Sequence, residues 1–165
     1  MTPFEAAHRP QHLLRQSVSI HLSGGRTLHG EIHIAEGQSL TGFLGEKRHF
    51  LNVTSARWDG EAEAGMLPHL SLRMSNVVWA VPNDGSLYLT SAETPSDDSR
   101  RVELHLVGGL VLDVTLNIAN ELRMSDYFDS GPSFIPLRQA TVRSTGRTID
   151  RLAVNHLAVL AIREQ

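Results

Sequence analysis

The sequence predicts an all-β protein made of two tandem five-stranded small barrels, each with a short helical insert between its second and third strands. Three observations support this fold class. The second half of the chain repeats the first, and short stretches of each copy alternate apolar with polar residues. Five short strands in about 60 residues bury little as a flat sheet, so we expect each copy to curl into a barrel.

The repeat covers most of the chain. Residues 18–56 align with residues 102–140 without a gap, and ten of the 39 aligned pairs are identical. The identical pairs are Val18/Val102, His21/His105, Leu22/Leu106, Gly24/Gly108, Gly25/Gly109, Leu28/Leu112, Ile34/Ile118, Ala35/Ala119, Phe50/Phe134 and Ala56/Ala140. After this block the second copy is expected to be shorter by three or four residues. We therefore expect a first barrel with an N-terminal arm in residues 1–82, a linker in residues 83–101 and a second barrel in residues 102–165.

Each copy opens with a predicted hairpin. Residues 18–22 alternate apolar with polar side chains, which is typical of a half-buried strand. Gly24-Gly25 then predicts a tight turn, because glycine tolerates the positive φ of primed hairpin turns. On the returning strand, the even-numbered residues of 28–34 are expected to point inward. Residues 112–118 repeat this pattern in the second copy.

A segment of helical character follows each hairpin. The two stretches are SLTGFLGEK, residues 39–47, and LRMSDYFDS, residues 122–130. We expect a short helix in each, with Leu40, Phe43 and Leu44 covering one end of the first barrel.

Three further strands complete each copy. In the first copy they are expected at FLNVTSARW, LSLRM and NVVWAV, and in the second at FIPLRQATVRS, TIDRLAV and HLAVLAI. Trp79 lies in the last strand of the first copy and is expected in the core or in a subunit interface. Ahead of the first barrel, residues 3–16 predict a short helix that is broken near Pro10.

This order of elements resembles the Sm/LSm small barrel. The resemblance is carried by VSIHLSGGRTLHGEI, FLNVTSA and RMSNVVWAV. The last stretch is similar to the family's second motif, in which an arginine precedes an apolar strand, and Arg73 lies where that arginine would. The corresponding stretch of the second copy is residues 153–156. The family's first motif, an Asp and an Asn in a tight loop, is replaced here by the segments around residues 36–49 and 120–133.

The resemblance implies two functions. Sm-like barrels join edge to edge, the fourth strand of one against the fifth of the next. Two barrels per chain therefore imply a homo-oligomer, and the sharpest expectation is a trimer that forms a six-barrel pseudo-ring. The resemblance also implies RNA binding, and the residues in the corresponding loops are Arg73, Asn76, Asn155 and His156. We expect an assembly module first, an RNA-binding protein as the alternative, and an enzyme acting on a small molecule third.

Composition argues against several other classes of protein. The net charge is −3, which is not the electrostatic footprint of a protein that grips a long run of phosphates. The chain has no cysteine, which excludes disulfides, thiol nucleophiles and cysteine-based zinc sites. No segment approaches the ~18 apolar residues of a membrane span, and the first residues lack a signal-peptide pattern. We expect a cytoplasmic protein without membrane partners.

The histidines do not predict a metal site. His29 and His33 share a strand face, but residues at i and i+4 of a strand lie about 13 Å apart, too far to bind one metal ion. His8 and His12 have helical spacing, but Pro10 between them removes a hydrogen bond on which that spacing depends. We therefore interpret these side chains as solvated surface groups.

No catalytic constellation is recognisable in the sequence. There is no G-x-S-x-G stretch, no Ser/His/Asp trio that the sequence brings together, and no phosphate loop or dinucleotide fingerprint. His21 and His105 recur at equivalent positions without a repeated partner, which favours a role in the scaffold. The acids Asp126 and Asp129 occur in the second copy only and are interpreted as helix-end charges. We expect neither enzymatic activity nor a cofactor.

Overall fold

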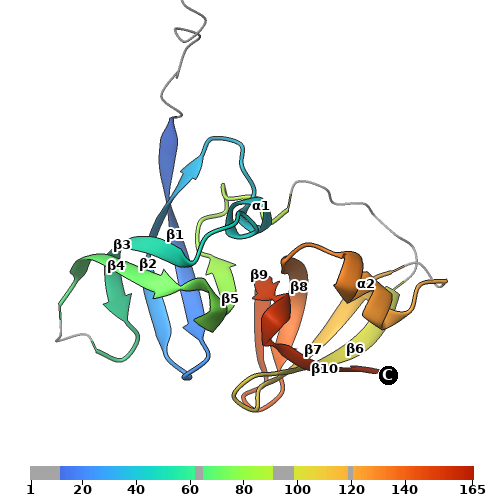
Figure 1. Cartoon of the computed structure of the whole chain (residues 1–165). Coiled ribbons are helices and arrows are strands. Elements are labelled where there is room, and N and C mark those ends of the chain that lie inside the picture. The colour runs from blue at the N-terminus through green and yellow to red at the C-terminus, as the bar shows by residue number, and fades with distance from the viewer. Residues whose placement is uncertain (1–11, 62–64, 91–98, 119–120) are drawn as a thin grey trace, which may run out of the picture.

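The computed structural model describes residues 12–61, 65–90, 99–118 and 121–165 (Figure 1). Its strands are β1 (Leu13–Leu22), β2 (Thr27–Ala35), β3 (Phe50–Trp58), β4 (Leu67–Arg73), β5 (Val77–Pro82), β6 (Ser99–Leu106), β7 (Val111–Asn117), β8 (Phe134–Val142), β9 (Arg147–Asn155) and β10 (Val159–Glu164). The helical elements are α1 (Leu40–Leu44), α2 (Met124–Ser130) and the 3-10 turns η2 (Met74–Asn76) and η3 (His156–Ala158). The prediction of an all-β protein is confirmed, and a short helix follows the first hairpin of each half as expected.

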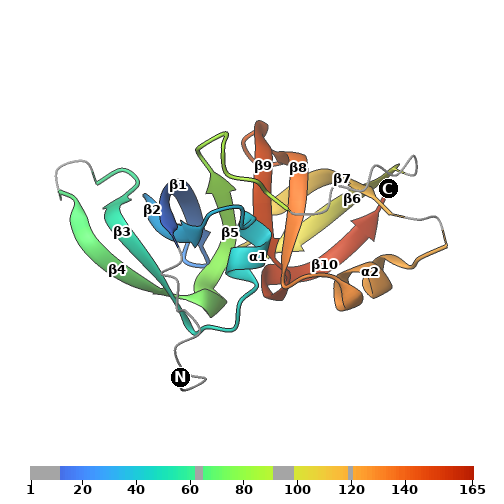
Figure 2. The same ribbon diagram turned by 90° about the horizontal axis from the view of Figure 1, so that it is seen from above.

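The ten strands form one antiparallel sheet that does not close on itself. Their order is β10-β6-β7-β8-β9-β5-β1-β2-β3-β4. Two separate five-stranded barrels were expected, but the hydrogen bonding continues from one half into the other because β5 pairs with β9. Figures 1 and 2 show the halves side by side, with β5 and β9 at their junction. Strands β4 and β10 are left at the two ends of the sheet.

The two halves repeat the same local contacts. Both have the strand order fifth, first, second, third, fourth. The Leu22 N–H donates to the Arg26 carbonyl at 2.9 Å, and the Leu106 N–H donates to the Leu110 carbonyl at 2.8 Å. Both predicted hairpin turns are therefore present and are closed by equivalent bonds. Gly25 adopts a φ of 88°, the left-handed conformation for which the glycine was expected.

The second half is shorter than the first between its third and fourth strands. Phe50 pairs with Arg73, and Phe134, which corresponds to Phe50, pairs with Asn155. Arg73 therefore corresponds to Asn155, and the second half is shorter at this point by two positions. The expected shortening of three or four was too large, because a sequence match alone does not fix the register of the fourth strand.

Burial alternates along β2 as the sequence predicts. The even-numbered residues from Leu28 to Ile34 are buried, and the odd-numbered residues between them are half-buried. Gly30 lets β3 approach closely, because a Cβ on this residue would lie 2.4 Å from the Val53 Cγ1 atom. The β2–β3 pairing is irregular at this point, between His29 and Glu31.

Each half has its own apolar core, and the two cores exchange residues at the junction. Phe134 and Ala153 of the second half pack into the core of the first half. In return, Val78 and Trp79 of β5 pack into the core of the second half. Trp79 is therefore a core residue that lies where the halves meet. The junction continues both cores rather than joining two finished surfaces.

The helices are short and differ in their burial. The first N–H groups of α1 are bonded by the Ser39 hydroxyl and by the carbonyls of Tyr88 and Leu89, so this helix is fixed to the segment that follows β5. All residues of α1 except Gly42 are buried, whereas α2 has no buried residue. Within the described ranges, no helix is long and apolar enough to cross a membrane.

The segment before the first hairpin differs from expectation. A helix was expected in residues 3–16, but residues 13–16 continue β1, and Leu13 pairs with Ala35 at the far end of β2. The pairing partner offered by β2 decides the conformation of this stretch, which its own composition did not reveal. Residues 1–11, with His8 and the rest of the expected helix, lie outside the described residues.

Part of the expected linker belongs to the first half. Leu87 and Leu89 are each only 2% exposed and pack into the first core. The Arg151 guanidinium of β9 donates to the Leu87 carbonyl at 2.7 Å and to the Asp84 carbonyl at 3.1 Å. This segment therefore ties the two halves together, while residues 91–98 of the expected linker are outside the described ranges.

Candidate functional site

A cavity of about 300 Å³ lies where the two halves meet. Four segments from both halves form its walls: Leu44–His49 after α1, Arg73–Ser75 at η2, Ser133–Phe134 at the start of β8, and Asn155–Leu157 at η3. Its volume is at the lower end of the range for small-ligand pockets. The site therefore exists only when both halves are joined.

Two equivalent backbone bonds position these walls. The Met74 N–H donates to the His49 carbonyl at 2.8 Å, and the His156 N–H donates to the Ser133 carbonyl at 2.9 Å. Each bond holds a 3-10 turn against the residue that precedes the third strand of the same half. Because β5 and β9 are paired, the two turns lie near the same end of the junction, and both border the cavity.

The cavity wall contributed by the first half is basic. Lys47, Arg48 and Arg73 line it together with one carboxylate, that of Glu46. Arg48 pairs with Glu46, donates to the Phe43 carbonyl at 3.0 Å and lies over the Phe43 ring. The cationic side chains exceed the carboxylate in number, so the cavity favours an anionic group.

Arg73 and His156 present polar atoms at this site. The Arg73 guanidinium lies over the Phe50 ring, 4.9 Å from its centroid, an arrangement that leaves its N–H donors free for an anion. The His156 Nδ1 atom is buried, and no described residue forms a hydrogen bond with it. A ligand group or a water molecule in the cavity could bond this nitrogen.

Asn155 is buried, and its amide is already engaged in the junction. The Nδ2 atom donates to the Val77 carbonyl at 3.0 Å and to the Met74 carbonyl at 3.4 Å, both in the first half. The Oδ1 atom accepts from the Leu157 N–H at 3.0 Å and caps η3. This side chain therefore holds the two halves together at the cavity wall.

The structure brings together three of the four residues that the sequence suggested for ligand binding. Arg73, Asn155 and His156 line the cavity, while Asn76 does not. The Asn76 side chain is exposed, and its carbonyl accepts from the Ser23 N–H at the first hairpin turn.

Lys47 and Arg48 also line the cavity, although the family motif did not predict them as site residues. The sequence did contain a sign of this basic cluster, because EKRH at residues 46–49 is replaced by the uncharged SGPS in the second half. Lys47 is also the only lysine in the chain.

A second polar group forms on the outer sheet face of the first half. The Ser19 hydroxyl lies 2.8 Å from the His29 Nδ1 atom, and the His29 Nε2 atom lies 3.1 Å from the Asp59 Oδ1 atom. This Ser/His/Asp trio was not predictable from the sequence, because Ser19 meets His29 only through the β1–β2 register. Asn83 also bonds the Ser19 hydroxyl, at 3.0 Å.

The second half carries a different polar group at the same three positions. Ser19 and His29 correspond to Glu103 and Asp113 in the alignment of the repeat, and Asp59 corresponds to Arg143, because each follows the third strand and bonds the equivalent carbonyl of its half. Arg143 donates to both carboxylates, at 2.6 Å to Glu103 and with a short bond to Asp113.

This replacement of a Ser/His/Asp trio by a salt bridge is typical of a contact between strands. The Asp59 side chain is also 69% exposed, which gives little of the water exclusion that catalytic triads use.

The remaining histidines make separate contacts. His33 bonds the Thr54 hydroxyl at 3.1 Å on its own part of the sheet, away from the His29–Asp59 pair. His21 stacks on the Trp79 ring at 4.4 Å between centroids, and burial lowers the pKa of its imidazole. Among the described residues, no group of three or more His, Cys, Asp or Glu side chains is arranged to hold a metal ion.

Known proteins offer no direct guide to this site. A comparison of the chain with protein-family models, with curated proteins and with solved structures finds no match. The functional evidence is therefore the junction between the halves, its cavity and the two strands that end the sheet.

Proposed function

We propose that this chain is an internally duplicated Sm-like barrel that assembles with copies of itself, edge to edge. One observation carries the proposal. The two halves are already joined by the fifth strand of one, β5, and the fourth strand of the other, β9. The remaining fourth strand, β4, and fifth strand, β10, are the two ends of the sheet. The contact within the chain can therefore be repeated between chains.

The internal junction is an apolar contact as well as a strand pairing. Trp79 pairs with Val154, and Ala80 pairs with Ala153, and all four side chains are buried. Val78 is 1% exposed because it packs into the core of the other half. A contact between chains would need a similar apolar side chain on the free edge.

Strand β10 carries such a side chain in an exposed position. Leu160 corresponds to Val78 when Arg73 is aligned with Asn155, and it is 68% exposed. An exposed apolar side chain on an unpaired sheet edge favours association with another chain. In the proposed assembly, Leu160 enters the first half of a neighbouring copy as Val78 enters the second half of its own chain.

Repeating this contact gives a head-to-tail assembly. Each chain has one β4 edge and one β10 edge, so the contact is heterologous and closes only as a ring. Three chains would give a pseudo-ring of six barrels. The internal register predicts the register between chains: Leu72 opposite Ala161, and Ser71 opposite Ile162.

Disulfide cross-linking tests this register in a chain that has no cysteine of its own. The double variant S71C/I162C should form covalent oligomers under mild oxidation, because paired positions bring the Cβ atoms within disulfide reach. The control S71C/R163C shifts the register by one residue and turns the second thiol to the other face. Equal cross-linking of both variants, or of neither, would contradict the proposed pairing.

Size-exclusion chromatography with light scattering tests the assembly itself. We expect a particle with three times the mass of the chain. This mass should stay constant as the protein concentration is raised, because a closed ring has no free edge to add further chains. A monomer at all concentrations would overturn the assembly. A mass that increases steadily with concentration would instead indicate an open chain and overturn only the ring.

RNA binding is a second candidate, and the basic cavity favours it. Lys47, Arg48 and Arg73 offer phosphate-binding groups beside the Phe50 ring, on which a base could stack. The equivalent loop of the second half, residues 129–133, reads DSGPS and has no cation. We therefore expect one RNA site in each chain rather than two.

Fluorescence anisotropy with short U-rich and A-rich RNAs at low and moderate salt tests this candidate. Lys47→Glu should weaken binding and reduce its salt dependence. The logarithm of the binding constant falls with the logarithm of the salt concentration with a slope of about −0.7 for each phosphate contact with a single strand. The matched control is Arg147→Glu, an exposed charge reversal at the opposite end of β9. No binding at low salt, or equal effects of the two variants, would exclude the cavity as an RNA site.

A further inference from the structure

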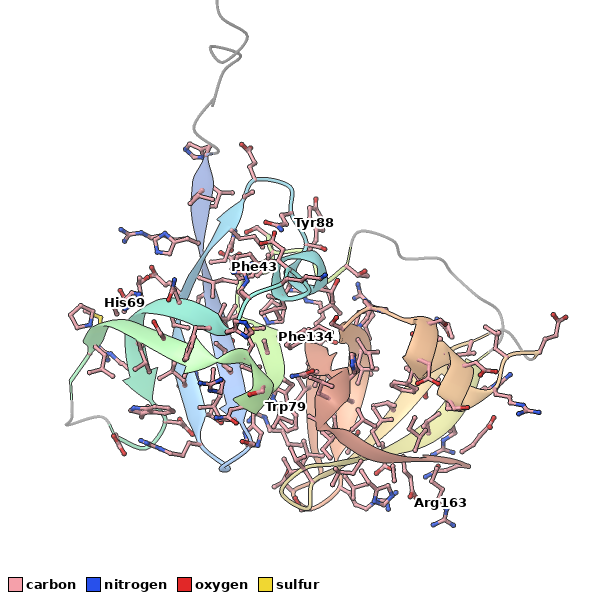
Figure 3. All side chains as sticks on the ribbon, in the orientation of Figure 1. Phe43, His69, Trp79, Tyr88, Phe134 and Arg163 are labelled. Atoms are coloured by element: carbon pink, nitrogen blue, oxygen red, sulfur yellow. The ribbon has the colours of Figure 1, made fainter. Side chains whose placement is uncertain are left out.

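A phenylalanine of the second half inserts into the first half. Phe134 is 3% exposed and packs in the core that contains Phe43 and Leu44 of α1. Helix α1 contacts β8, the strand that Phe134 begins. Figure 3 shows Phe43 and Phe134 where the two halves meet. The helical insert of one half therefore receives an aromatic side chain from the next.

The same two parts are present, but apart, near the two ends of the sheet. Phe50 corresponds to Phe134 and is 47% exposed at the start of β3. On the other half, Tyr127 and Phe128 of α2 correspond to Phe43 and Leu44 of α1 and are only half-buried. The first half thus presents an exposed aromatic ring, and the second presents an incompletely covered helix.

The charges at these two places are also complementary. Arg73 corresponds to Asn155, the residue whose amide bonds the other half at the internal junction. Asp129 corresponds to Gly45, which lines the same cavity as Asn155. Repeating the junction between chains would therefore bring Arg73 of one copy to the cavity wall that Asp129 of another copy forms. Neither side chain forms an ion pair with a described residue.

We propose that Phe50 and Arg73 of one chain dock on helix α2 of a second copy. The Phe50 ring packs against Tyr127 and Phe128, and the Arg73 guanidinium pairs with Asp129. The Arg73 guanidinium already lies over the Phe50 ring, so both groups approach the partner together. A second copy is the occupant because the contact continues the internal junction position for position. This contact rests on the proposed edge-to-edge assembly, and it specifies which side chains each chain recognises on the next.

The apolar part is tested by Phe50→Ser. Losing a buried aromatic ring should weaken association roughly 10- to 100-fold, measured by sedimentation velocity as the concentration of half-dissociation. The matched control is Tyr88→Ser, because Tyr88 is also an exposed aromatic residue, at 67%, but its carbonyl is bonded to the first residue of α1 and it belongs to neither β4 nor β10. Circular dichroism spectra of both variants should match that of the parent chain, since neither ring is in a core.

The polar part is tested by a charge exchange between the two partners. Arg73→Asp and Asp129→Arg should each weaken association, because each places like charges opposite one another. The double variant R73D/D129R should recover most of the loss. Recovery cannot arise from misfolding of either single variant, so it reports the contact between the chains directly.

The outcomes separate this contact from the assembly on which it rests. A parent chain that stays monomeric at every concentration would overturn both. Cross-linking of S71C/I162C together with unchanged association of Phe50→Ser would leave the strand pairing intact and overturn the Phe50 contact. Failure of R73D/D129R to recover association would overturn the Arg73–Asp129 pair.

Discussion

Asp59 and Arg143 occupy the same position in the two halves of this chain and carry opposite charges. The Asp59 N–H donates to the Thr27 carbonyl at 2.8 Å, and the Arg143 N–H donates to the Val111 carbonyl at 3.0 Å. Both residues follow the third strand of their half and return to the outer face of its first hairpin. The backbone position is thus retained while the chemistry of the side chain is inverted.

The neighbouring side chains are changed to match. Asp59 lies opposite the His29 imidazole, whereas Arg143 lies between the carboxylates of Glu103 and Asp113. Glu103 and Asp113 are direct cross-strand partners, so without Arg143 two negative charges would face each other. Each half therefore stabilises the same strand pairing with a different set of polar groups.

The Glu103 network predicts loss of stability in acid. Hydrogen bonds from Arg143, Gln165 and His105 lower the Glu103 pKa to about 2, below its ordinary value of 4.5. A depressed folded-state pKa contributes stability that is present above pH 4.5 and is lost as the pH falls toward 2. Thermal melting from pH 6 to pH 2 should therefore show a larger decrease for the parent chain than for Glu103→Gln.

The control for that experiment is Glu36→Gln, an exposed glutamate away from the network. This variant should follow the parent chain across the whole pH range. An equally steep acid dependence of Glu103→Gln would show that the network does not contribute to acid stability.

The Ser19–His29–Asp59 group is predicted to be catalytically inert. The Ser19 hydroxyl lies on an open sheet face, bonded to Asn83 as well as to His29, and the Asp59 carboxylate is largely exposed. Hydrolysis of p-nitrophenyl acetate should therefore proceed at the same rate with the parent chain and with Ser19→Ala. A decrease of tenfold or more in Ser19→Ala would contradict a purely structural role for this group.

Gly30 is predicted to tolerate no side chain. A methyl group there would meet the Val53 Cγ1 atom at 2.4 Å and the Thr54 carbonyl oxygen at 3.0 Å. Gly30→Ala should lower the free energy of unfolding by about 1–3 kcal/mol, measured by urea denaturation. Gly85→Ala is the control, because no atom lies within 4 Å of its added Cβ. Similar effects of both substitutions would show that β3 can move away from β2.

Asn155 is predicted to stabilise the junction between the halves. Asn155→Ala leaves the carbonyls of Met74 and Val77 without their side-chain donor in a buried site, at a cost of about 1–3 kcal/mol. Chemical denaturation should show this loss. The exposed asparagine at η2, Asn76, provides the control, and Asn76→Ala should change stability by less than about 0.5 kcal/mol. A small effect of Asn155→Ala would indicate that the junction does not depend on this side chain.

Local patterns predicted much of the fold. Alternation in residues 28–34, the glycine turns and the short helical inserts all appear where expected, because period-two burial and positive-φ turns are properties of a few adjacent residues. The prediction of a helix at the end of the N-terminal segment was wrong, since residues 13–16 become strand only by pairing with β2. Segments whose conformation depends on a distant partner are not specified by their own composition.

The candidate site was only partly predictable. Arg73 and His156 could be suggested from a family motif, and both line the cavity. Lys47 and Arg48 were overlooked because they lie in an insert that the family motif lacks. The Ser19–His29 contact was also overlooked, because the β1–β2 register, and not proximity in sequence, brings the two side chains together.

The sequence by itself determined the two matching sets of strands, their turns and their inward-facing residues, all of which depend on local periodicity and glycine conformation. Only the tertiary structure decided that the sets share one sheet, because the pairing of β5 with β9 joins residues far apart in the sequence, which local periodicity does not specify. That single pairing creates the cavity and buries Phe134 and Val78. It also leaves β4 and β10 as the two free ends of the sheet.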